Sequence, residues 1–496
     1  MAKCIMVQGT MSGVGKSILV TGLCRLFARE GYRVAPFKSQ NMALNSFVTP
    51  DGLELGRAQA VQAEAAWKAC DVRMNPILLK PSSETGSQLI VMGEVRGTYD
   101  ARDYFRMKKS LLPEILDAYH SLAAENDILV IEGAGSPAEI NLREDDIVNM
   151  GLAELVHAPV LLVGDIDRGG VFAQLYGTVS LLRPNERDLL AGMLINKFRG
   201  DPALLLPGLR QIEALTGLPV LGLIPWLPLD IDDEDSLAPR LTDSPGKKLL
   251  DVAVVRLPRI SNFTDFAPLG SHPAVGVRYV ASPAKLGKPD LLILPGTKNT
   301  MADLDWLRES GFAEQIYHSH AEGVPILGVC GGFQLLGRRI SDPEGVEKRG
   351  SREGLGLLPC ETVFCGGKTR QRRVAVCTAA PFAGARLEGY EIHMGVTEGD
   401  GASFCRLDDG REDGCVQGTV FGTYLHGLFD SGELTIRLAE WLAAKKGLCI
   451  APQEPENRAV WRNRQYDLLA DTLQKTLDRQ AIDRAMEAFS DEKQTG

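Results

Sequence analysis

The sequence lacks three features that would point to whole classes of protein. No apolar run reaches the roughly 18 residues of a membrane-spanning helix, so we expect no membrane span. Basic residues are not in excess, because 54 lysines and arginines stand against 64 acidic residues, and the net charge of −10 argues against a nucleic-acid partner. The ten cysteines form neither C-x-x-C pairs nor Cys/His clusters. Several of them lie in apolar strand patterns, which is typical of reduced cytosolic thiols.

The length of 496 residues predicts two or more domains, each with an ample core. We expect a first domain over residues 1–228, an acidic linker rich in turn residues over 229–248, a second domain over 249–448 and a C-terminal helical tail over 449–496. The first apolar strand begins at Cys4, which leaves no room for a signal peptide, so we expect a cytoplasmic protein.

The most informative segment lies near the middle of the chain. A short apolar strand, Ile326–Val329, ends at Cys330 between small residues, and an apolar helical pattern follows. Glycines at positions 328 and 332 allow a nucleophile to sit on a strained turn, where side chains would crowd the backbone. The helix N-terminus behind it favours the thiolate. The segment therefore predicts a cysteine nucleophile, and the alternative is a buried structural cysteine.

The spacing G-x-C-x-G-x-Q, from Gly328 to Gln334, resembles the nucleophile elbow of class I glutamine amidotransferases. That resemblance implies hydrolysis of glutamine by a cysteine thiolate. The tetrahedral intermediate also needs donors for its oxyanion. We expect these from the backbone N–H groups near Gly296, which follows another buried strand, and Gly331, beside the nucleophile.

A cysteine nucleophile needs a base, and His426 is the best candidate among the seven histidines. It ends an apolar strand-like segment and precedes a small-residue turn, and the two partners need to be adjacent only in space. His393 lies in another strand-like segment, and we expect it to line the site. Class I amidotransferases usually carry a glutamate two residues after the histidine, but here that residue is Leu428. We therefore expect a Cys-His dyad, with Asp430 a weak candidate for orienting the imidazole.

A phosphate-binding loop stands at the start of the chain, between an apolar strand and a helix. Backbone N–H groups of such a loop cradle phosphates, a lysine neutralises them, and a hydroxyl can bind Mg²⁺. The strict spacing is not met, and five residues between Gly9 and Gly15 resemble the variant of dethiobiotin synthetase. The expected ATP-binding residues in the loop are Gly9, Thr10, Gly13, Gly15, Lys16 and Ser17.

Polar side chains also follow later buried strands, where ligands of parallel sheets bind. Lys38 is placed to touch a transferring phosphoryl group, and Glu132 is expected to hold Mg²⁺ together with Ser17. Asn196 follows a strand whose end contacts the purine in relatives of dethiobiotin synthetase. The predicted fold is α/β: a P-loop domain with a parallel sheet, followed by a class I amidotransferase-like α/β domain.

Both modules together resemble the cobyric acid synthase family over essentially the whole chain. Four further segments carry this resemblance: residues 40–46, 56–59, 165–170 and 390–395. The resemblance implies that ATP, Mg²⁺ and glutamine serve to amidate the b, d, e and g carboxylates of adenosylcobyrinic acid a,c-diamide, giving adenosylcobyric acid. It also matches the absence of the usual glutamate after the histidine, which is a feature of the amidotransferases that act on corrin rings.

Two alternatives remain from the sequence. One is a cobyrinic acid a,c-diamide synthase, which shares both modules but matches residues 40–46 and 165–170 less well. The other is a regulatory P-loop ATPase whose amidotransferase-like domain only binds. Partitioning ATPases carry a lysine early in the loop, where this chain has Met11, and this difference favours small-molecule chemistry. The oligomeric state is left open.

Overall fold

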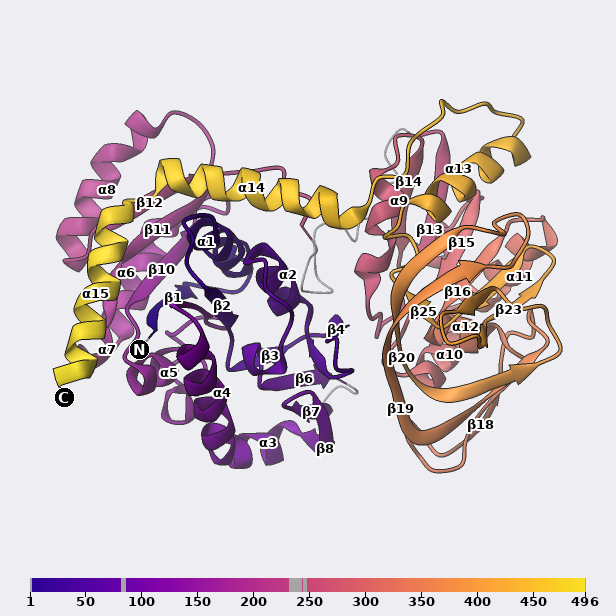
Figure 1. The fold of residues 1–496 in the computed structure, drawn as a ribbon, viewed down its shortest axis with the longest axis horizontal. Coiled ribbons are helices and arrows are strands. Elements are labelled where there is room, and N and C mark those ends of the chain that lie inside the picture. The colour runs from indigo at the N-terminus through magenta and orange to yellow at the C-terminus, as the bar shows by residue number, and fades with distance from the viewer. Residues whose placement is uncertain (1, 82–85, 232–242, 244–247, 496) are drawn as a thin grey trace. The chain divides into compact units, whose positions relative to one another are not determined.

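A computed structural model of the chain describes residues 2–81, 86–231, 243 and 248–495. The chain forms two compact units, coloured by residue number in Figure 1. The first comprises Met1–Ala43, Leu53–Ile231 and Arg462–Gly496, and the second comprises Leu44–Gly52 and Asp232–Trp461.

This division differs from the expected domain boundaries in two places. Residues 44–52 come from the early part of the sequence but belong to the second unit, and most of the expected C-terminal tail belongs to the first. The expected linker, 229–248, falls largely on residues 232–242 and 244–247, which lie outside the described part of the chain.

The first unit is built on a six-stranded parallel sheet with the order β12-β11-β10-β1-β9-β2. Its strands are β1 (Lys3–Gly9), β2 (Val34–Phe37), β9 (Ile128–Glu132), β10 (Val160–Asp165), β11 (Leu190–Phe198) and β12 (Val220–Pro225). Long apolar runs such as Ile128–Glu132 are buried throughout, as strands covered on both faces must be. The expected parallel sheet is confirmed.

Helices connect and cover these strands. They are α1 (Lys16–Arg29), α2 (Arg57–Ala65), α3 (Ala101–Met107), α4 (Leu112–Glu125), α5 (Met150–Val156), α6 (Val171–Leu181), α7 (Pro184–Arg187) and α8 (Pro202–Thr216). A smaller sheet has the order β3 (Gln40–Met42), β6 (Ile77–Pro81), β7 (Gly86–Val91) and β8 (Glu94–Asp100). It follows β2 in the chain and so extends the structure beyond that edge of the large sheet (Figure 1).

The C-terminal tail, expected to be helical, forms two separate helices. Helix α14 (Arg458–Thr476) and helix α15 (Arg479–Thr495) are separated at Asp478, whose side chain accepts the N–H of Ala481 and caps α15. Leu469 and Leu473 of α14 pack over Gly22 of α1, where an added Cβ would lie 2.4 Å from Leu473. The tail is thus part of the core of the first unit.

The second unit also contains a six-stranded sheet, with the order β14-β13-β15-β16-β24-β23. Its strands are β13 (Leu250–Val255), β14 (Val275–Val280), β15 (Leu291–Leu294), β16 (Ile326–Val329), β23 (Cys415–Gln417) and β24 (Val420–Thr423). All neighbours are parallel except β23, which pairs antiparallel with β24. The helices of this unit are α9 (Ala267–Ser271), α10 (Thr300–Glu309), α11 (Phe312–Ala321), α12 (Gly331–Leu336) and α13 (Glu433–Lys445).

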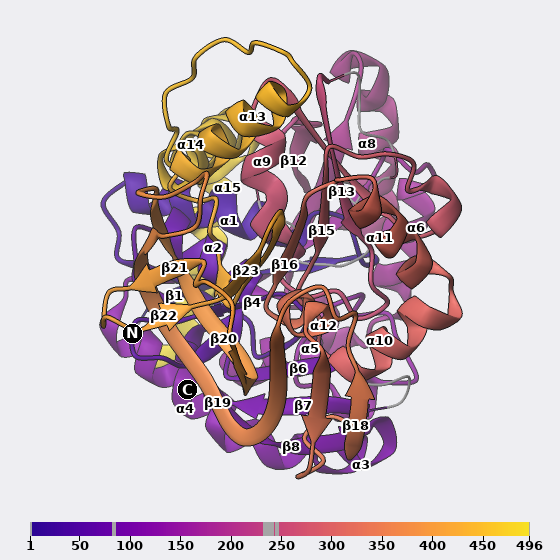
Figure 2. The same ribbon diagram turned by 90° about the vertical axis from the view of Figure 1, so that its right-hand side faces the viewer.

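A long antiparallel pair is the main feature that the sequence does not predict. Strands β19 (Cys360–Cys377) and β20 (Arg386–Gly399) lie side by side, as Figure 2 shows, and join a sheet of order β18-β17-β19-β20-β25. The other members are β17 (Arg339–Asp342), β18 (Gly350–Glu353) and β25 (Leu425–His426), and β21 (Cys405–Leu407) and β22 (Glu412–Asp413) branch from β19. This sheet brings residues 390–395 beside His426.

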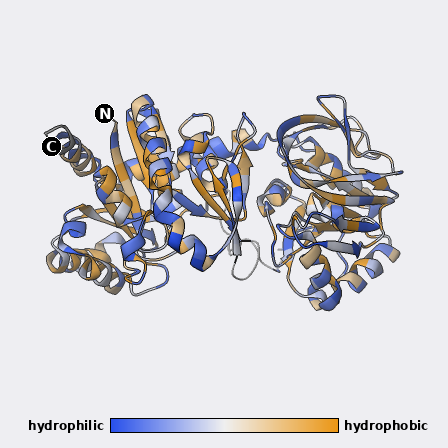
Figure 3. Ribbon diagram, turned by 90° about the horizontal axis from the view of Figure 1, so that it is seen from below, coloured by the Kyte–Doolittle hydropathy of each residue, from blue (hydrophilic) through white to orange (hydrophobic). Residues whose placement is uncertain are grey.

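Hydrophobic residues concentrate in the strands of both units, and hydrophilic residues in the turns and on the outer faces of helices (Figure 3). Within the described residues, no helix is both long and apolar enough to cross a membrane.

Candidate active sites

The nucleophile predicted at Cys330 sits on a strained turn between β16 and α12. Its backbone has φ 52° and ψ −109°, a region that non-glycine residues rarely occupy. The neighbouring glycines explain how the turn fits. A Cβ on Gly332 would lie 1.9 Å from the carbonyl oxygen of Leu294, and one on Gly328 would lie 2.6 Å from the carbonyl oxygen of Gly332. The geometry therefore matches a nucleophile elbow and differs from an ordinary buried cysteine.

Gln334, the last residue of the elbow pattern, fastens this turn to the surrounding strands. Its Nε2 donates to the carbonyl oxygen of Met394 at 3.0 Å and to the Tyr424 hydroxyl at 3.1 Å. Its Oε1 accepts from the Thr300 hydroxyl at 3.0 Å. The Cys330 thiol itself donates to the carbonyl oxygen of Ile392 in β20 at 3.6 Å. The contacts of Gln334 and Cys330 thus hold the elbow against several neighbouring segments.

His426 lies in the same site, and its imidazole has a carboxylate partner. Nδ1 is 2.6 Å from Oδ2 of Asp265, and both side chains are buried. Nε2 is buried with no hydrogen-bond partner among the described residues, so it is available to exchange a proton with the thiol. The expectation of a dyad without an orienting carboxylate is wrong. Asp265 supplies the carboxylate that is absent at Leu428, and it takes the role for which Asp430 was the weak candidate.

The electrostatics favour a charged imidazole. Burial lowers the pKa of His426, but the charges of Asp265 and Cys330 and the hydrogen bond to Asp265 raise it to about 10. A pKa of about 10 makes the imidazolium the dominant form of the ring at neutral pH. His393 has a different setting, because its ring stacks on Tyr424 at 3.7 Å and its Nδ1 faces the carbonyl oxygen of Gly395 at 3.1 Å.

The two glycines expected at the oxyanion site come together. A Cβ on Gly296 would lie 3.2 Å from Cε1 of His426, and a Cβ on Gly331 would lie 3.0 Å from the backbone nitrogen of Thr297. Gly331 begins α12, and the first N–H groups of a helix have no acceptor within the helix itself. Gly296 therefore lies beside the imidazole, and Gly331 lies beside Thr297, the residue that follows Gly296.

Residues 44–52 support the histidine from within the second unit. The Ser46 N–H donates to Oδ1 of Asn262 at 3.2 Å, and Nδ2 of Asn262 lies 3.5 Å from Nδ1 of His426. Phe47 contacts Tyr390 with ring centroids 6.0 Å apart, and Tyr390 stacks on His426 at 5.2 Å with an interplanar angle of 14°. Part of the 40–46 segment, which lies within the bounds expected for the first domain, therefore packs around the amidotransferase site.

The phosphate-binding loop of the first unit follows β1 in the middle of the parallel sheet. Gly13 and Gly15 adopt left-handed φ angles of 75° and 100°, which favour glycine. A Cβ on Gly15 would lie 2.3 Å from Nδ2 of Asn196, and that nitrogen donates to the carbonyl oxygen of Val14 at 2.7 Å. Asn196 thus braces the loop, and its expected contact with a purine stays a prediction.

Lys16 is held by backbone oxygens. Its Nζ donates to the carbonyl oxygen of Met11 at 3.2 Å and to that of Gly135 at 3.0 Å. Gly9 is sterically required, because a Cβ there would lie 2.5 Å from the Val14 side chain. Thr10 donates its hydroxyl proton to Oε1 of Gln174.

Glu132, at the end of β9, gathers the side chains expected to handle the phosphoryl group. Its Oε1 accepts from the Ser17 hydroxyl and from Nζ of Lys38, both at 2.9 Å, and its Oε2 accepts from Nε2 of Gln62. Within the described ranges, no group of three or more His, Cys, Asp or Glu side chains could hold a metal. Nucleotide-bound Mg²⁺ needs only one or two protein oxygens besides phosphates, so the hydroxyl of Ser17 and the carboxylate of Glu132 fit it.

Several residues of these sites were missed by the sequence reasoning. Asp265 and Asn262 follow β13, a buried strand of the second unit, and polar residues after a buried parallel strand were a usable signal. Gln62 carried no local motif. The ion pair of Asp165 with Lys197 (2.7 Å), whose Nζ also donates to the carbonyl oxygen of Gly13, joins two strand ends that the sequence did not pair.

The two centres define a class of protein: an α/β synthetase with a phosphate-binding loop, joined in one chain to a glutamine amidotransferase. Family models agree with this division. Residues 5–236 match a CobQ/CobB/MinD/ParA nucleotide binding domain, and residues 251–434 match a CobB/CobQ-like glutamine amidotransferase domain.

Relatives extend the match to nearly the full chain. The chain is 52% identical to a cobyric acid synthase of Ruminiclostridium cellulolyticum, covering 98% of each chain. It is 51% identical to a cobyric acid synthase of Yersinia enterocolitica (99% of this chain, 98% of the other) and 50% identical to one of Photorhabdus laumondii (97% and 98%). The chain belongs to the cobyric acid synthase family, as the sequence motifs predicted.

Proposed function

We propose that this protein is an ATP- and glutamine-dependent amidotransferase that converts the b, d, e and g carboxylates of adenosylcobyrinic acid a,c-diamide to amides, giving adenosylcobyric acid. The observation that carries the proposal is the presence, in one chain of this family, of a complete Cys330–His426–Asp265 arrangement and a phosphate-binding loop with Ser17 beside Glu132. The relatives' names favour this activity over the a,c-diamide synthase, and both assembled centres argue against a purely regulatory P-loop protein.

The synthetase centre would activate the carboxylate, because a carboxylate is a poor electrophile until it is phosphorylated. Backbone N–H groups of residues 9–17 would cradle the phosphates, and Lys16 and Lys38 would stabilise negative charge on the transferring group. Ser17 and Glu132 would hold the Mg²⁺ that accompanies ATP. Ammonia then displaces phosphate from the acyl phosphate, forming the amide.

The glutaminase centre would supply that ammonia. The Cys330 thiolate attacks the side-chain amide of glutamine, and donors at Gly296 and Gly331 would hold the oxyanion. The His426 imidazolium would protonate the departing ammonia, and Asp265 would keep the ring oriented. Water then hydrolyses the thioester to glutamate.

We further propose a cytoplasmic location. All ten cysteines are free, and thiols persist in a reducing compartment where ATP and glutamine are also available.

The test is mass spectrometry of the corrinoid after incubation with ATP, Mg²⁺ and glutamine labelled with ¹⁵N in its amide. We expect label in the b, d, e and g amides and ATP-dependent release of glutamate. Unlabelled product, or amidation only at positions a and c of cobyrinic acid, would contradict the proposal.

A further inference from the structure

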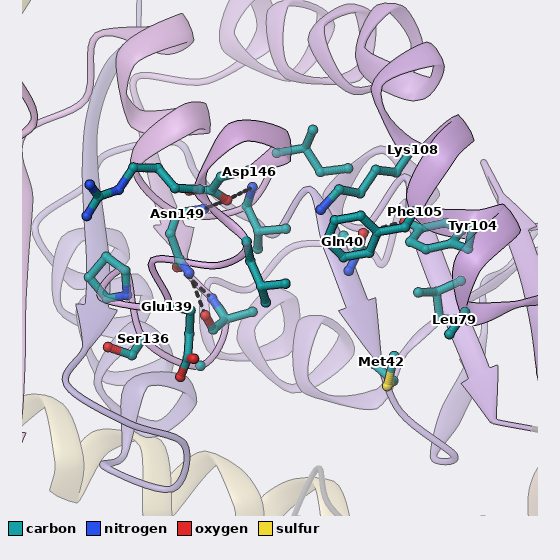
Figure 4. A pocket seen from close by; sticks show the side chains of 18 of the residues that line it. Gln40, Met42, Leu79, Tyr104, Phe105, Lys108, Ser136, Glu139, Asp146 and Asn149 are labelled. Atoms are coloured by element: carbon teal, nitrogen blue, oxygen red, sulfur yellow. Dashed lines mark hydrogen bonds between the residues drawn. The ribbon is translucent and has the colours of Figure 1, made fainter. Parts of the chain in front are cut away.

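The first unit contains a cavity of about 460 Å³ beside the smaller sheet. Its walls include Gln40 and Met42 of β3, Tyr104 and Phe105 of α3, and Lys108 of the short 3₁₀ helix that follows α3 (Figure 4). The opposite wall is the segment after β9, residues 134–150. Most of the surface that lines the cavity is apolar, so it fits a ligand with an apolar body.

The cavity adjoins the phosphate-binding loop. Gly135 lines it, and the carbonyl oxygen of the same residue accepts from Nζ of Lys16. The segments that form it follow β9 and β2, on one side of central β1, whereas Asn196 ends β11 on the other side. If the nucleotide base binds on the β11 side, this cavity stays open for the molecule that receives the phosphoryl group.

Lys108 supplies a cation to this cavity that has no counter-ion within the described residues. Its side chain is buried, with 8% of the residue exposed, and Nζ lies 3.9 Å from the centroid of the Phe105 ring. Figure 4 shows the side chain extending from its helical turn toward Gln40. Burial lowers the pKa of Lys108, and the charges of Asp145 and Asp146 offset part of this effect. A buried ammonium without a partner is costly, so an anion bound there would be stabilised.

The acidic residues of the cavity do not compete for Lys108. Asp146 accepts the backbone N–H groups of Val148, Asn149 and Gly151, and Glu186 accepts that of Arg183. Asp100 accepts the backbone N–H of Asp103, and Glu139 is exposed to solvent. Arg143 also lines the cavity, but its guanidinium donates to the carbonyl oxygen of Leu181 and lies 3.7 Å from Glu186. Lys108 therefore remains available for an incoming carboxylate.

We propose that this cavity holds the apolar edge of the corrinoid and that Lys108 binds one of its acid side chains. The inference rests on the proposed function, because it assigns the site of the corrinoid substrate. Its chemical consequence is selectivity: an ammonium binds a carboxylate by charge and hydrogen bond, and a primary amide at the same place offers no charge. The site should thus prefer corrinoids that still carry carboxylates.

The test compares two ligands and two lysine variants of the full chain. The ligands are cobyrinic acid a,c-diamide and the same corrinoid with every carboxylate converted to a primary amide, each titrated by equilibrium dialysis. Lys108→Met keeps the length and apolar character of the side chain but removes its charge. Lys109→Met is the matched control, since Lys109 is adjacent, largely exposed and paired with Asp145 at 3.0 Å. Lys108→Arg tests for rescue by a second cation.

We expect Lys108→Met to weaken binding of the diamide roughly tenfold to hundredfold, as loss of a charge-assisted hydrogen bond does, and to leave the fully amidated corrinoid unchanged. Lys109→Met should bind both ligands like the unmodified protein, and Lys108→Arg should recover part of the loss. Equal losses for both corrinoids, or no loss for either, would overturn the assignment of Lys108. If the unmodified protein binds neither corrinoid, the proposed function fails instead.

Discussion

The two candidate active sites differ in what their charged side chains contact. In the glutaminase centre, the imidazole of His426 is bonded to the carboxylate of Asp265, and the turn at Cys330 is already strained. In the synthetase centre, Lys16 donates to two backbone carbonyl oxygens, at Met11 and Gly135. Carbonyl oxygens are weaker partners for an ammonium than phosphate oxygens, so ATP can displace them.

The comparison indicates that the glutaminase centre is assembled by the protein alone, whereas Lys16 in the synthetase centre exchanges backbone partners for the phosphates of its ligand. Preorganised contacts in the glutaminase centre require no reorganisation during the reaction. Each site also has a separate chemical task, since one releases ammonia and the other activates a carboxylate. Substitutions in the two sites should therefore produce different dependences on the nitrogen donor.

The largest effect is expected from Cys330→Ala. It should abolish glutamine-dependent amidation and leave ATP-dependent amidation with a high concentration of ammonia intact, because only release of ammonia from glutamine needs the thiolate. Amide formation with each donor is the measurement. Equal loss with both donors would show that Cys330 has a structural or shared role and would remove the distinction between the sites.

Substitutions in the synthetase centre should impair amidation with both nitrogen donors, unlike Cys330→Ala. Lys16→Ala removes charge that stabilises the transferring phosphoryl group, so amidation should slow by roughly a hundredfold or more with glutamine and with ammonia alike. Glu132→Gln should also impair both reactions and raise the Mg²⁺ concentration needed for half-maximal rate. Near-normal turnover of Glu132→Gln at low Mg²⁺ would contradict the metal assignment.

An effect confined to one donor, glutamine, is expected from Asp265→Asn. The carboxylate orients the imidazole and supports its charge, and loss of this role in a comparable triad slows catalysis by up to about 10⁴-fold. Asp430→Asn is the matched control, because Nδ1 of His426 bonds Asp265 and not Asp430. If Asp430→Asn costs as much as Asp265→Asn, with folding intact, the triad assigned from the geometry is wrong.

Local motifs explain how much of these sites could be predicted from the sequence. The elbow at Cys330 and the loop containing Lys16 are short segments in which residue types and spacing follow directly from backbone strain and phosphate binding. The parallel sheets follow from apolar strands that alternate with helices. These features depend on residues that are close in sequence, so the single amino-acid sequence was enough to predict them.

The features that could not be predicted depend on contacts across long sequence separations. Asp265 lies 161 positions before His426. The residues close to the histidine in sequence offered only Leu428 and Asp430 at the places where an orienting carboxylate was expected. Residues 44–52 belong to the second unit, although their position in the sequence falls within the bounds expected for the first domain. The break of the tail into two helices depends on packing over Gly22 and on the cap at Asp478, which periodicity alone does not show.

The smallest effect, and the sharpest test of preassembly, concerns the charge of His426. Its pKa is raised from the ordinary value of 6.5 to about 10, so the folded protein binds this proton more tightly than the unfolded chain does. The resulting contribution to the free energy of unfolding is fully present below pH 6.5 and is lost as the pH rises through about 10. Asp265→Asn should lower this pKa, so its deficit in unfolding free energy should be fully present at pH 6.5 and shrink as the pH rises toward 10. Titration of the His426 Cε1–H resonance by NMR, with chemical denaturation at several pH values, measures both quantities. A His426 midpoint near 6.5 in the unmodified protein would show that the imidazolium is not preformed, and the contrast between the two sites would then disappear.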